Sequence, residues 1–486
     1  MTTIVDSNLP VARPSWDHSR LESRIVHLGC GAFHRAHQAL YTHHLLESTD
    51  SDWGICEVNL MPGNDRVLIE NLKKQQLLYT VAEKGAESTE LKIIGSMKEA
   101  LHPEIDGCEG ILNAMARPQT AIVSLTVTEK GYCADAASGQ LDLNNPLIKH
   151  DLENPTAPKS AIGYIVEALR LRREKGLKAF TVMSCDNVRE NGHVAKVAVL
   201  GLAQARDPQL AAWIEENVTF PCTMVDRIVP AATPETLQEI ADQLGVYDPC
   251  AIACEPFRQW VIEDNFVNGR PDWDKVGAQF VADVVPFEMM KLRMLNGSHS
   301  FLAYLGYLGG YETIADTMTN PDYRKAAFAL MMQEQAPTLS MPEGTDLNAY
   351  ATLLIERFSN PSLRHRTWQI AMDGSQKLPQ RLLDPVRLHL QNGGSWRYLA
   401  LGVAGWMRYT KGVDEQGNAI DVVDPMLAEF QKINAQYQGA DRVKALLGLS
   451  GIFADDLPQN ADFVGAVTAA YQQLCERGAR ECVAAL

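Results

Sequence analysis

The chain has 486 residues and a formal net charge of −16. Its length exceeds what one hydrophobic core ordinarily holds, and 46% hydrophobic with 21% charged residues is a soluble globular composition, so we expect two domains. The acidic charge repels nucleic acid and anionic membranes at long range, so neither is an expected partner.

Strand-like and helix-like segments alternate through the first part of the chain. This alternation predicts an α/β fold with a mostly parallel sheet and helices on both faces, a Rossmann-type doubly wound domain over residues 1–284. The expected strands are residues 24–29, 53–60, 91–97, 121–128 and 179–185, and the expected helices are residues 34–48, 160–176 and 193–206.

From about residue 285 the apolar spacing is mainly helical, and few β-branched runs remain. We therefore expect a mainly helical domain over residues 285–486 that carries substrate binding and catalysis. Its clearest helical segments are residues 287–308, 323–335, 348–358 and 396–412.

The cysteines indicate a reducing compartment. None of the 10 is spaced C-x-x-C, and several stand in apolar runs, as Cys56 does in WGICEV. Buried free cysteines behave as small hydrophobic residues. We find no signal segment before the first strand and no apolar run of membrane-spanning length, so we expect a cytoplasmic protein.

The stretch HLGCGAFHRAHQ carries part of a dinucleotide-binding fingerprint. Gly29 and Gly31 follow the first strand, where glycine lets main-chain N–H groups approach a pyrophosphate. The third glycine of G-x-G-x-x-G is absent, and His34 stands in its place. The motif alone fits an ordinary turn equally well, but its position at the first strand–helix junction favours a cofactor loop. Arg35 would then contact phosphate.

An acidic residue is expected to bind the adenosine ribose. Asp65, beyond the second strand, is the candidate, although its distance from the glycines exceeds the usual spacing of about 20 residues. Glu57 competes but lies inside the strand, and the alternative role of Asp65 is that of a turn-former. A metal site at His34 and His37 is not expected, because a zinc site needs a third ligand.

Lys291 is a candidate acid/base in the segment KLRMLNGSHS. On a regular helix Glu288, Lys291, Leu295 and His299 share roughly one face, and Asn296 lies at its edge. An apolar cleft lowers the pKa of a lysine toward neutrality, where it can exchange protons. The alternative is a solvated lysine beside an apolar helix face.

Asp186 and Asn187 end the strand AFTVMSC, where ligands of open α/β sheets bind. The Asn187 amide could donate to a substrate oxygen. The alternative is a helix N-cap or a turn residue.

Together these pieces resemble the mannitol dehydrogenase family of polyol dehydrogenases and uronate reductases. The resemblance covers essentially the whole chain. Its loop has the same G-x-G-x-F-H-R-A-H form, and the K-x-x-x-x-N-x-x-H spacing and the VDRI-x-P segment are specific. The matching segments are residues 29–37, 124–132, 180–187, 224–230, 254–271 and 291–300.

The resemblance implies an NAD-dependent enzyme with no catalytic zinc. Lys291 matches the general acid/base, Asn187 and Asn296 match the amides that bind the reacting oxygen, and His299 matches a histidine that binds substrate. Glu288 matches a proton-relay glutamate. Asp65 matches the acid that favours NAD over NADP, Asp226 lies in a signature segment, and the loop residues expected at the cofactor are Gly29, Gly31, Ala32, Phe33, His34 and Arg35.

The N-terminal block and the length are most similar to family members that interconvert D-fructuronate and D-mannonate in hexuronate catabolism. Such a sugar acid needs a cation for its carboxylate. Arg364 and Arg366 are the first candidates, Lys377, Arg381 and Arg293 are further options, and a solvated helix face is the alternative. A mannitol or arabinitol dehydrogenase, a tagaturonate reductase and a non-catalytic NAD-binding protein remain alternatives. The oligomeric state is left open.

Overall fold

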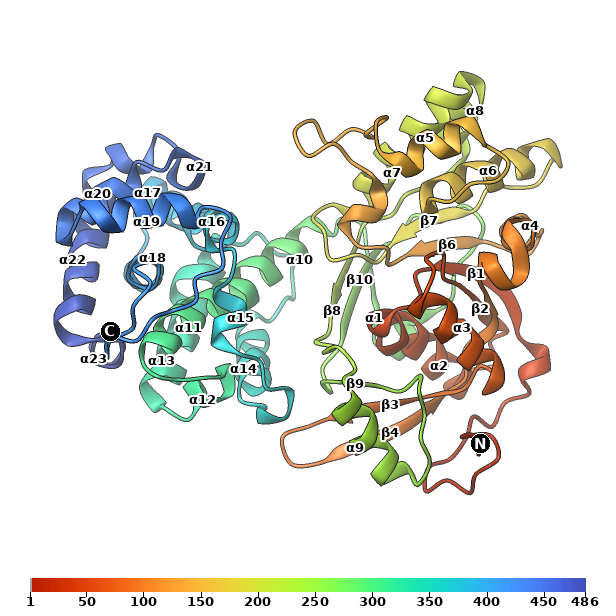
Figure 1. Cartoon of the computed structure of the whole chain (residues 1–486), viewed down its shortest axis with the longest axis horizontal. Helices are drawn as coiled ribbons and strands as arrows, with labels where there is room; N and C mark the ends of the chain where they lie inside the picture. Colours follow the sequence, from red (N-terminus) through yellow and green to blue (C-terminus); the bar gives the residue numbers. More distant parts are fainter. Residues whose placement is uncertain (1) are drawn as a thin grey trace. The chain divides into compact units, whose positions relative to one another are not determined.

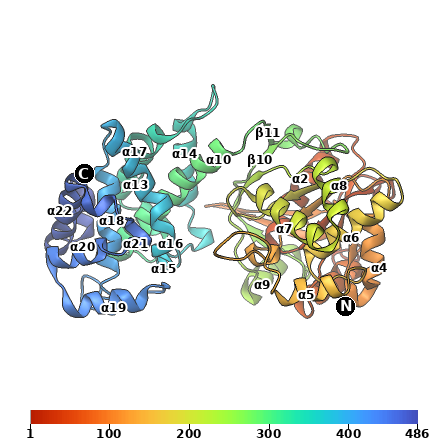
Figure 2. The same ribbon diagram turned by 90° about the horizontal axis from the view of Figure 1, so that it is seen from above.

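The computed structural model describes residues 2–486. The chain forms two compact units, Met1–Val285 and Pro286–Leu486, whose elements are labelled in Figures 1 and 2.

The first unit is built on a five-stranded parallel sheet of order β5-β2-β1-β6-β7. The strand order reverses at β1, which pairs with β2 on one side and β6 on the other. This arrangement confirms the expected Rossmann-type fold. The strands are β1 (Glu22–Leu28), β2 (Trp53–Val58), β5 (Met97–Leu101), β6 (Ile122–Leu125) and β7 (Thr181–Ser184).

Helices cover both faces of this sheet. Successive side chains of β1 point to opposite faces and pack into a different hydrophobic core on each. Val26 and Leu28 pack with the apolar residues of α4, α6 and α7, whereas Ile25 packs with those of α2 and α3. Strands buried on both faces have this nearly continuous apolar character. The helices are α1 (Ala32–Ala36), α2 (Gln38–Ser48), α3 (Asn64–Lys74), α4 (Pro103–Met115), α5 (Pro146–Glu153), α6 (Ala161–Glu174), α7 (Asn191–Arg206), α8 (Pro208–Asn217) and α9 (Pro234–Leu244).

Two smaller sheets complete the first unit, of order β11-β10-β8 and β4-β3-β9. The expectation of one strand over residues 91–97 is wrong, because the chain leaves β4 and enters β5 of the central sheet. At the break, the Gly95 N–H donates to His43 Nδ1 (3.1 Å) rather than to a strand. The strands are β3 (Tyr79–Lys84), β4 (Thr89–Ile94), β8 (Thr223–Asp226), β9 (Ile252–Cys254), β10 (Gln259–Glu263) and β11 (Gln279–Val281).

The second unit is helical, as expected. The segment 287–308 is a continuous helix, but α10 (Val285–Met290) and α11 (Gly297–Leu308) are joined by a π-helix, Lys291–Asn296. Two further segments, Leu330–Gln335 and Pro379–Leu383, are also π-helical. The longer helices of this unit are α13 (Pro321–Ala329), α14 (Leu347–Phe358), α17 (Asp384–Asn392), α18 (Arg397–Tyr409), α19 (Leu427–Gln436), α20 (Gly439–Leu447) and α22 (Ala461–Arg477), and the shorter ones are α12 (Ile314–Met318), α15 (Thr367–Ala371), α16 (Gly374–Leu378), α21 (Ser450–Phe453) and α23 (Ala479–Ala484).

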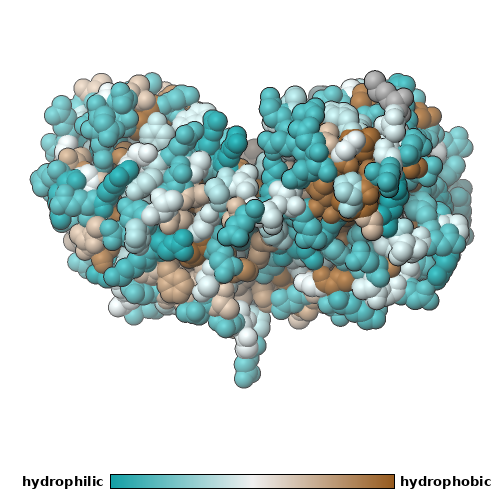
Figure 3. Space-filling model, turned by 90° about the horizontal axis from the view of Figure 1, so that it is seen from below, coloured by the Kyte–Doolittle hydropathy of each residue, from teal (hydrophilic) through white to brown (hydrophobic). Residues whose placement is uncertain are grey.

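Hydrophilic residues occupy most of the face drawn in Figure 3, with smaller apolar areas between them. Within residues 2–486, none of the helices has both the length and the apolar character that crossing a membrane requires.

Candidate active site

The two glycines after β1 have different roles. Gly29 has φ +100°, and a Cβ there would overlap the main-chain carbonyl of Thr126. The Thr126 hydroxyl donates to Gly29 O (2.7 Å) and fixes this close approach. Gly31 has ordinary backbone geometry, and a Cβ there would enter open space. The turn therefore requires glycine at 29, whereas glycine at 31 leaves room for a ligand.

A cavity of about 250 Å³ lies at the carboxyl ends of β1, β2 and β6. This is the point where the strand order of the sheet reverses, the usual ligand position in such folds. Asp65 stands in the first turn of α3, and its carboxylate accepts the Met61 N–H (3.3 Å). It thus serves as a turn residue and still faces the cavity. The lining includes Gly29, Cys30, Gly31, Asn59, Asp65, Thr126 and Thr128.

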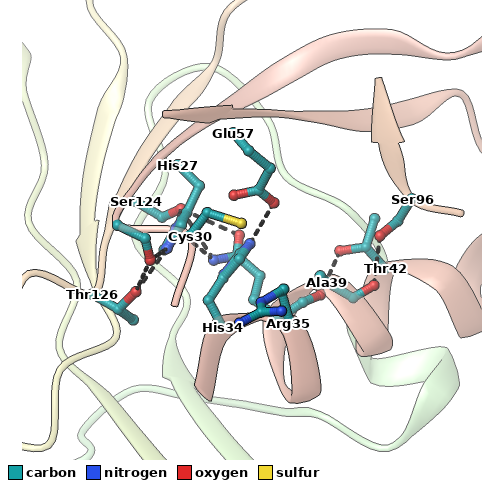
Figure 4. Close-up of polar contacts among 12 residues, drawn as sticks. His27, Cys30, His34, Arg35, Ala39, Thr42, Glu57, Ser96, Ser124 and Thr126 are labelled. Carbon is teal, nitrogen blue, oxygen red and sulfur yellow. Dashed lines mark hydrogen bonds and ion pairs between the residues drawn. The ribbon is translucent and has the colours of Figure 1, made fainter. Parts of the chain in front are cut away.

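His34, in the place of the third glycine, lies in a buried cluster rather than at the cavity. Its ring stacks on His27 of β1 with a centroid separation of 3.4 Å, and its Nε2 is 2.6 Å from Glu57 Oε1 (Figure 4). Burial lowers the pKa of His34 to about 3 and raises the pKa of Glu57 to about 7. Glu57, the competing ribose ligand, is therefore already engaged inside the domain.

The cluster of His27, His34 and Glu57 has the residue types of a metal site but the geometry of a hydrogen-bond network. The two imidazoles are parallel within 8°, so their in-plane lone pairs cannot point at one common ion. Both nitrogens of His27 also have close partners, at 2.6 Å to Ser124 Oγ and 2.8 Å to Thr126 Oγ1.

The other expected cofactor residues of the loop lie in α1. Arg35 is buried, and its guanidinium donates to the carbonyls of Gly31 and Cys250. Ala32 and Phe33 are half-buried. Because none of the three is among the residues that line the cavity, the loop meets it through Gly29, Cys30 and Gly31.

The end of β7 carries a residue whose role the sequence did not reveal. The buried Asp186 carboxylate accepts the N–H groups of Val127 (3.1 Å) and Thr128 (2.9 Å) and the Tyr132 hydroxyl (2.5 Å). It thereby ties the loop after β6, which lines the cavity, to the end of β7. Asn187 follows, exposed; it does not cap α7, whose N-cap is Glu190. Asp226 is buried at the end of β8.

In the second unit, the π-helix changes which residues share a face. A π-helix bonds residue i to residue i+5 and turns less per residue than an α-helix, so Asn296 lies on the turn after Lys291, about 50° from it around the axis instead of about 140°. Leu295, expected on the same face as Lys291, is buried in the core. Lys291, Asn296 and, in α10, Glu288 are half-buried.

His299 is buried in α11 against two rings, Phe358 at 4.8 Å and His365 at 5.2 Å between centroids. Burial, with neighbouring cations, lowers the pKa of His299 well below its ordinary value. The imidazole is therefore neutral near pH 7 and has one nitrogen to donate and one to accept a hydrogen bond.

The candidate cationic side chains for a substrate carboxylate differ in how far they are buried. Arg364 and Arg366 are exposed, next to the short helix α15. Arg293 donates to Thr338 O (2.9 Å). Lys377 and Arg381 are half-buried; Lys377 donates to Ile370 O (3.2 Å).

Comparison with known proteins agrees with the division of the chain. Residues 23–275 match the mannitol dehydrogenase Rossmann domain, and residues 283–475 match the mannitol dehydrogenase C-terminal domain. The chain belongs to the mannitol dehydrogenase family. This assignment confirms the resemblance inferred from the glycine loop and the K-x-x-x-x-N-x-x-H segment.

Within the mannitol dehydrogenase family, the chain is 99% identical to a D-mannonate oxidoreductase of Escherichia coli (strain K12), over 486 residues and 100% of both chains. Two solved structures are also similar. A D-sorbitol dehydrogenase in substrate-free form has 35% identity and a TM-score of 0.92, over 98% of each chain. A Pseudomonas fluorescens mannitol 2-dehydrogenase in a ternary complex with NAD and D-mannitol has 39% identity and a TM-score of 0.79, over 98% of this chain and 96% of that one.

Proposed function

We propose that this chain is an NAD-dependent oxidoreductase that interconverts D-fructuronate and D-mannonate, a step of hexuronate catabolism. One observation carries the substrate assignment: 99% identity to a D-mannonate oxidoreductase along the entire chain. The mannitol 2-dehydrogenase with NAD and D-mannitol is only 39% identical, so a sugar acid is favoured over a polyol.

The cavity of the first unit fits NAD. Its wall offers the Gly29–Gly31 loop, with open space at Gly31, and the Asp65 carboxylate. A carboxylate accepts hydrogen bonds from a ribose 2′-hydroxyl and repels a 2′-phosphate, so we assign Asp65 to the choice of NAD over NADP. Asp186 contributes indirectly, because it holds the Val127–Thr128 segment of the same wall. When bound, NADH supplies the hydride for the reduction.

Lys291 is the proposed general acid/base. In the reductive direction its ammonium gives a proton to the ketone oxygen at carbon 5, and in the oxidative direction the neutral amine takes the hydroxyl proton. The amide N–H groups of Asn296 and Asn187 are the proposed donors to that oxygen, where negative charge develops. The position of Asn296 one π-turn from Lys291 supports a shared role for these two residues.

Two further residues complete the proposal. His299, neutral because it is buried, is assigned to the substrate hydroxyls and to the orientation of Lys291. Glu288 precedes Lys291 by three residues and is half-buried, which suits a relay of protons between the lysine and solvent.

The test follows NADH absorbance with the purified chain and D-fructuronate, D-tagaturonate or D-fructose in separate assays. We expect fast oxidation of NADH with D-fructuronate and formation of NADH when NAD and D-mannonate are supplied. Preference for D-fructose would assign the chain to the polyol dehydrogenases instead. NADH binding without turnover of any of the three would reject the enzymatic role for these substrates.

A further inference from the structure

The fully buried arginines of this fold donate hydrogen bonds from at least two of their three nitrogens. Arg172 donates three hydrogen bonds to main-chain carbonyls from its Nε and Nη1, whereas its Nη2 has no partner within residues 2–486. Arg227 donates four, one of them to the Glu83 carboxylate. Arg442 also has four acceptors. Such bonding is what burial of a charged guanidinium requires.

Arg381 donates from a single nitrogen. Only its Nη1 is engaged, at 3.4 Å from Asn296 O and 3.2 Å from Ser300 Oγ. Within residues 2–486 it forms no ion pair, and its Nε and Nη2 have no hydrogen-bond partner. The side chain is half-buried, and burial lowers its pKa to about 10, so the guanidinium is still charged at neutral pH.

The charged groups that act on His299 are cationic, although the chain has a net charge of −16; the carboxylates of Asp373 and Asp424 act on Lys377. The pKa of His299 is lowered by burial and then by His365, Arg381, Arg357 and Lys377. The side chains of Arg381, Arg357 and Lys377 therefore place three positive charges near this buried imidazole. The main charged groups that shift the His299 pKa include no carboxylate. An anion that entered this region would be stabilised by the same charges.

We propose that Arg381 binds the carboxylate of the sugar-acid substrate through its unoccupied N–H groups. The guanidinium fork matches a carboxylate with two parallel hydrogen bonds. This assignment replaces Arg364 and Arg366, whose exposed side chains lie in water, where an ion pair contributes little.

The chemistry of the substrate fits this position. In D-fructuronate the carboxylate is four carbon–carbon bonds from the ketone carbon, so both ends must be bound close together. Arg381 is hydrogen-bonded to the carbonyl of Asn296, whose amide is the proposed donor to the ketone oxygen. Neighbouring groups of the second unit thus serve both ends of one short molecule. The inference rests on the proposed function and names its specificity determinant.

The test compares the wild-type enzyme with Arg381→Met and Arg381→Lys. We expect Arg381→Met to raise the KM for D-fructuronate by about 10- to 100-fold, because a hydrogen bond to a charged group contributes this much. Arg381→Lys keeps the positive charge but loses the two-pronged geometry of the guanidinium, so its KM for D-fructuronate should lie between those of the wild type and Arg381→Met. The KM for NADH and the circular dichroism spectrum should not change. Arg397→Met, which removes an exposed arginine of the same unit, is the matched control.

A second measurement separates carboxylate binding from support of Asn296. The inhibition constants of D-mannonate and of uncharged D-mannitol are measured on each variant. Carboxylate binding predicts that Arg381→Met weakens D-mannonate alone, whereas loss of a purely structural contact weakens both equally and would overturn the inference. An unchanged KM in Arg381→Met, or a raised KM in Arg366→Met instead, would overturn it too. Failure of the wild-type enzyme to reduce D-fructuronate would count against the proposed function itself.

Discussion

His34 Nε2 lies 2.6 Å from Glu57 Oε1, and neither side chain is exposed to solvent. A third glycine normally lets the first helix pack tightly on the sheet. In this chain the imidazole of His34 fills that space by stacking on His27, and Glu57 of β2 is the hydrogen-bond partner of His34 Nε2. The departure from the fingerprint is therefore compensated inside the domain and leaves the cavity side of the loop open.

This pair predicts a defined dependence of stability on pH. Burial raises the pKa of Glu57 from 4.5 to about 7, so the folded protein keeps a proton that the unfolded chain loses. The contribution of Glu57 to the free energy of unfolding thus falls as pH rises from 4.5 to 7. The pKa of His34 is lowered to about 3, so the contribution of His34 falls instead as pH drops below 6.5. Glu57→Gln removes only the first dependence. Relative to wild type, the variant should gain on the order of 2 kcal/mol between pH 5 and pH 7.5.

Thermal melting of wild type and Glu57→Gln at several pH values measures this difference. Glu87→Gln, which neutralises an exposed carboxylate, should follow the wild-type profile. A melting-temperature difference between Glu57→Gln and wild type that is the same at all pH values would show that Glu57 does not hold the extra proton.

Substitutions of the two loop glycines should affect stability and NADH binding differently. Gly29→Ala places a Cβ on the Thr126 carbonyl at φ +100°, so it should lower the melting temperature and weaken NADH binding together. Gly31→Val places its side chain in open space at the cavity, so it should raise the dissociation constant of NADH without lowering the melting temperature. Fluorescence titration with NADH and thermal melting separate the two effects. Normal NADH affinity in Gly31→Val would argue against this cavity as the cofactor site.

Replacement of Lys291 tests the acid/base assignment. Lys291→Met should lower kcat by about 10²- to 10⁴-fold with unchanged NADH affinity, because only proton transfer is removed. Lys411→Met, at an exposed lysine of the same unit, serves as the control. Turnover near the wild-type rate in Lys291→Met would reject the assignment.

Asp65 should determine the choice of cofactor. Asp65→Ser removes the carboxylate that repels a 2′-phosphate, so kcat/KM should fall with NADH and rise with NADPH. The ratio of the two values, measured at saturating D-fructuronate, is expected to move by at least about tenfold, in the range of one charged hydrogen bond. An unaltered ratio would transfer the role to another residue of the cavity.

The fold class followed from the sequence because strand and helix periods alternate in residues 22–206 and helical spacing dominates later. The segment from Lys291 to His299 was also recognisable by its spacing. Long-range pairings could not be recognised in this way, because no local pattern in the sequence joins His34 to Glu57 or Asp186 to Thr128. The burial that distinguishes Arg381 from Arg364 and Arg366 depends on tertiary packing, which a list of arginines in one segment does not reveal.

The π-helix between α10 and α11 has a consequence for which substitutions this family can accept. A π-turn is in effect an α-helix with one residue added. Regular α-helical winding of the same residues, at about 100° per residue, would rotate Asn296 and α11 by about 90° relative to the lysine. The helix would survive while its amide and imidazole turned away. Natural selection should therefore preserve the π-helical turn of this segment as strictly as the identity of its residues.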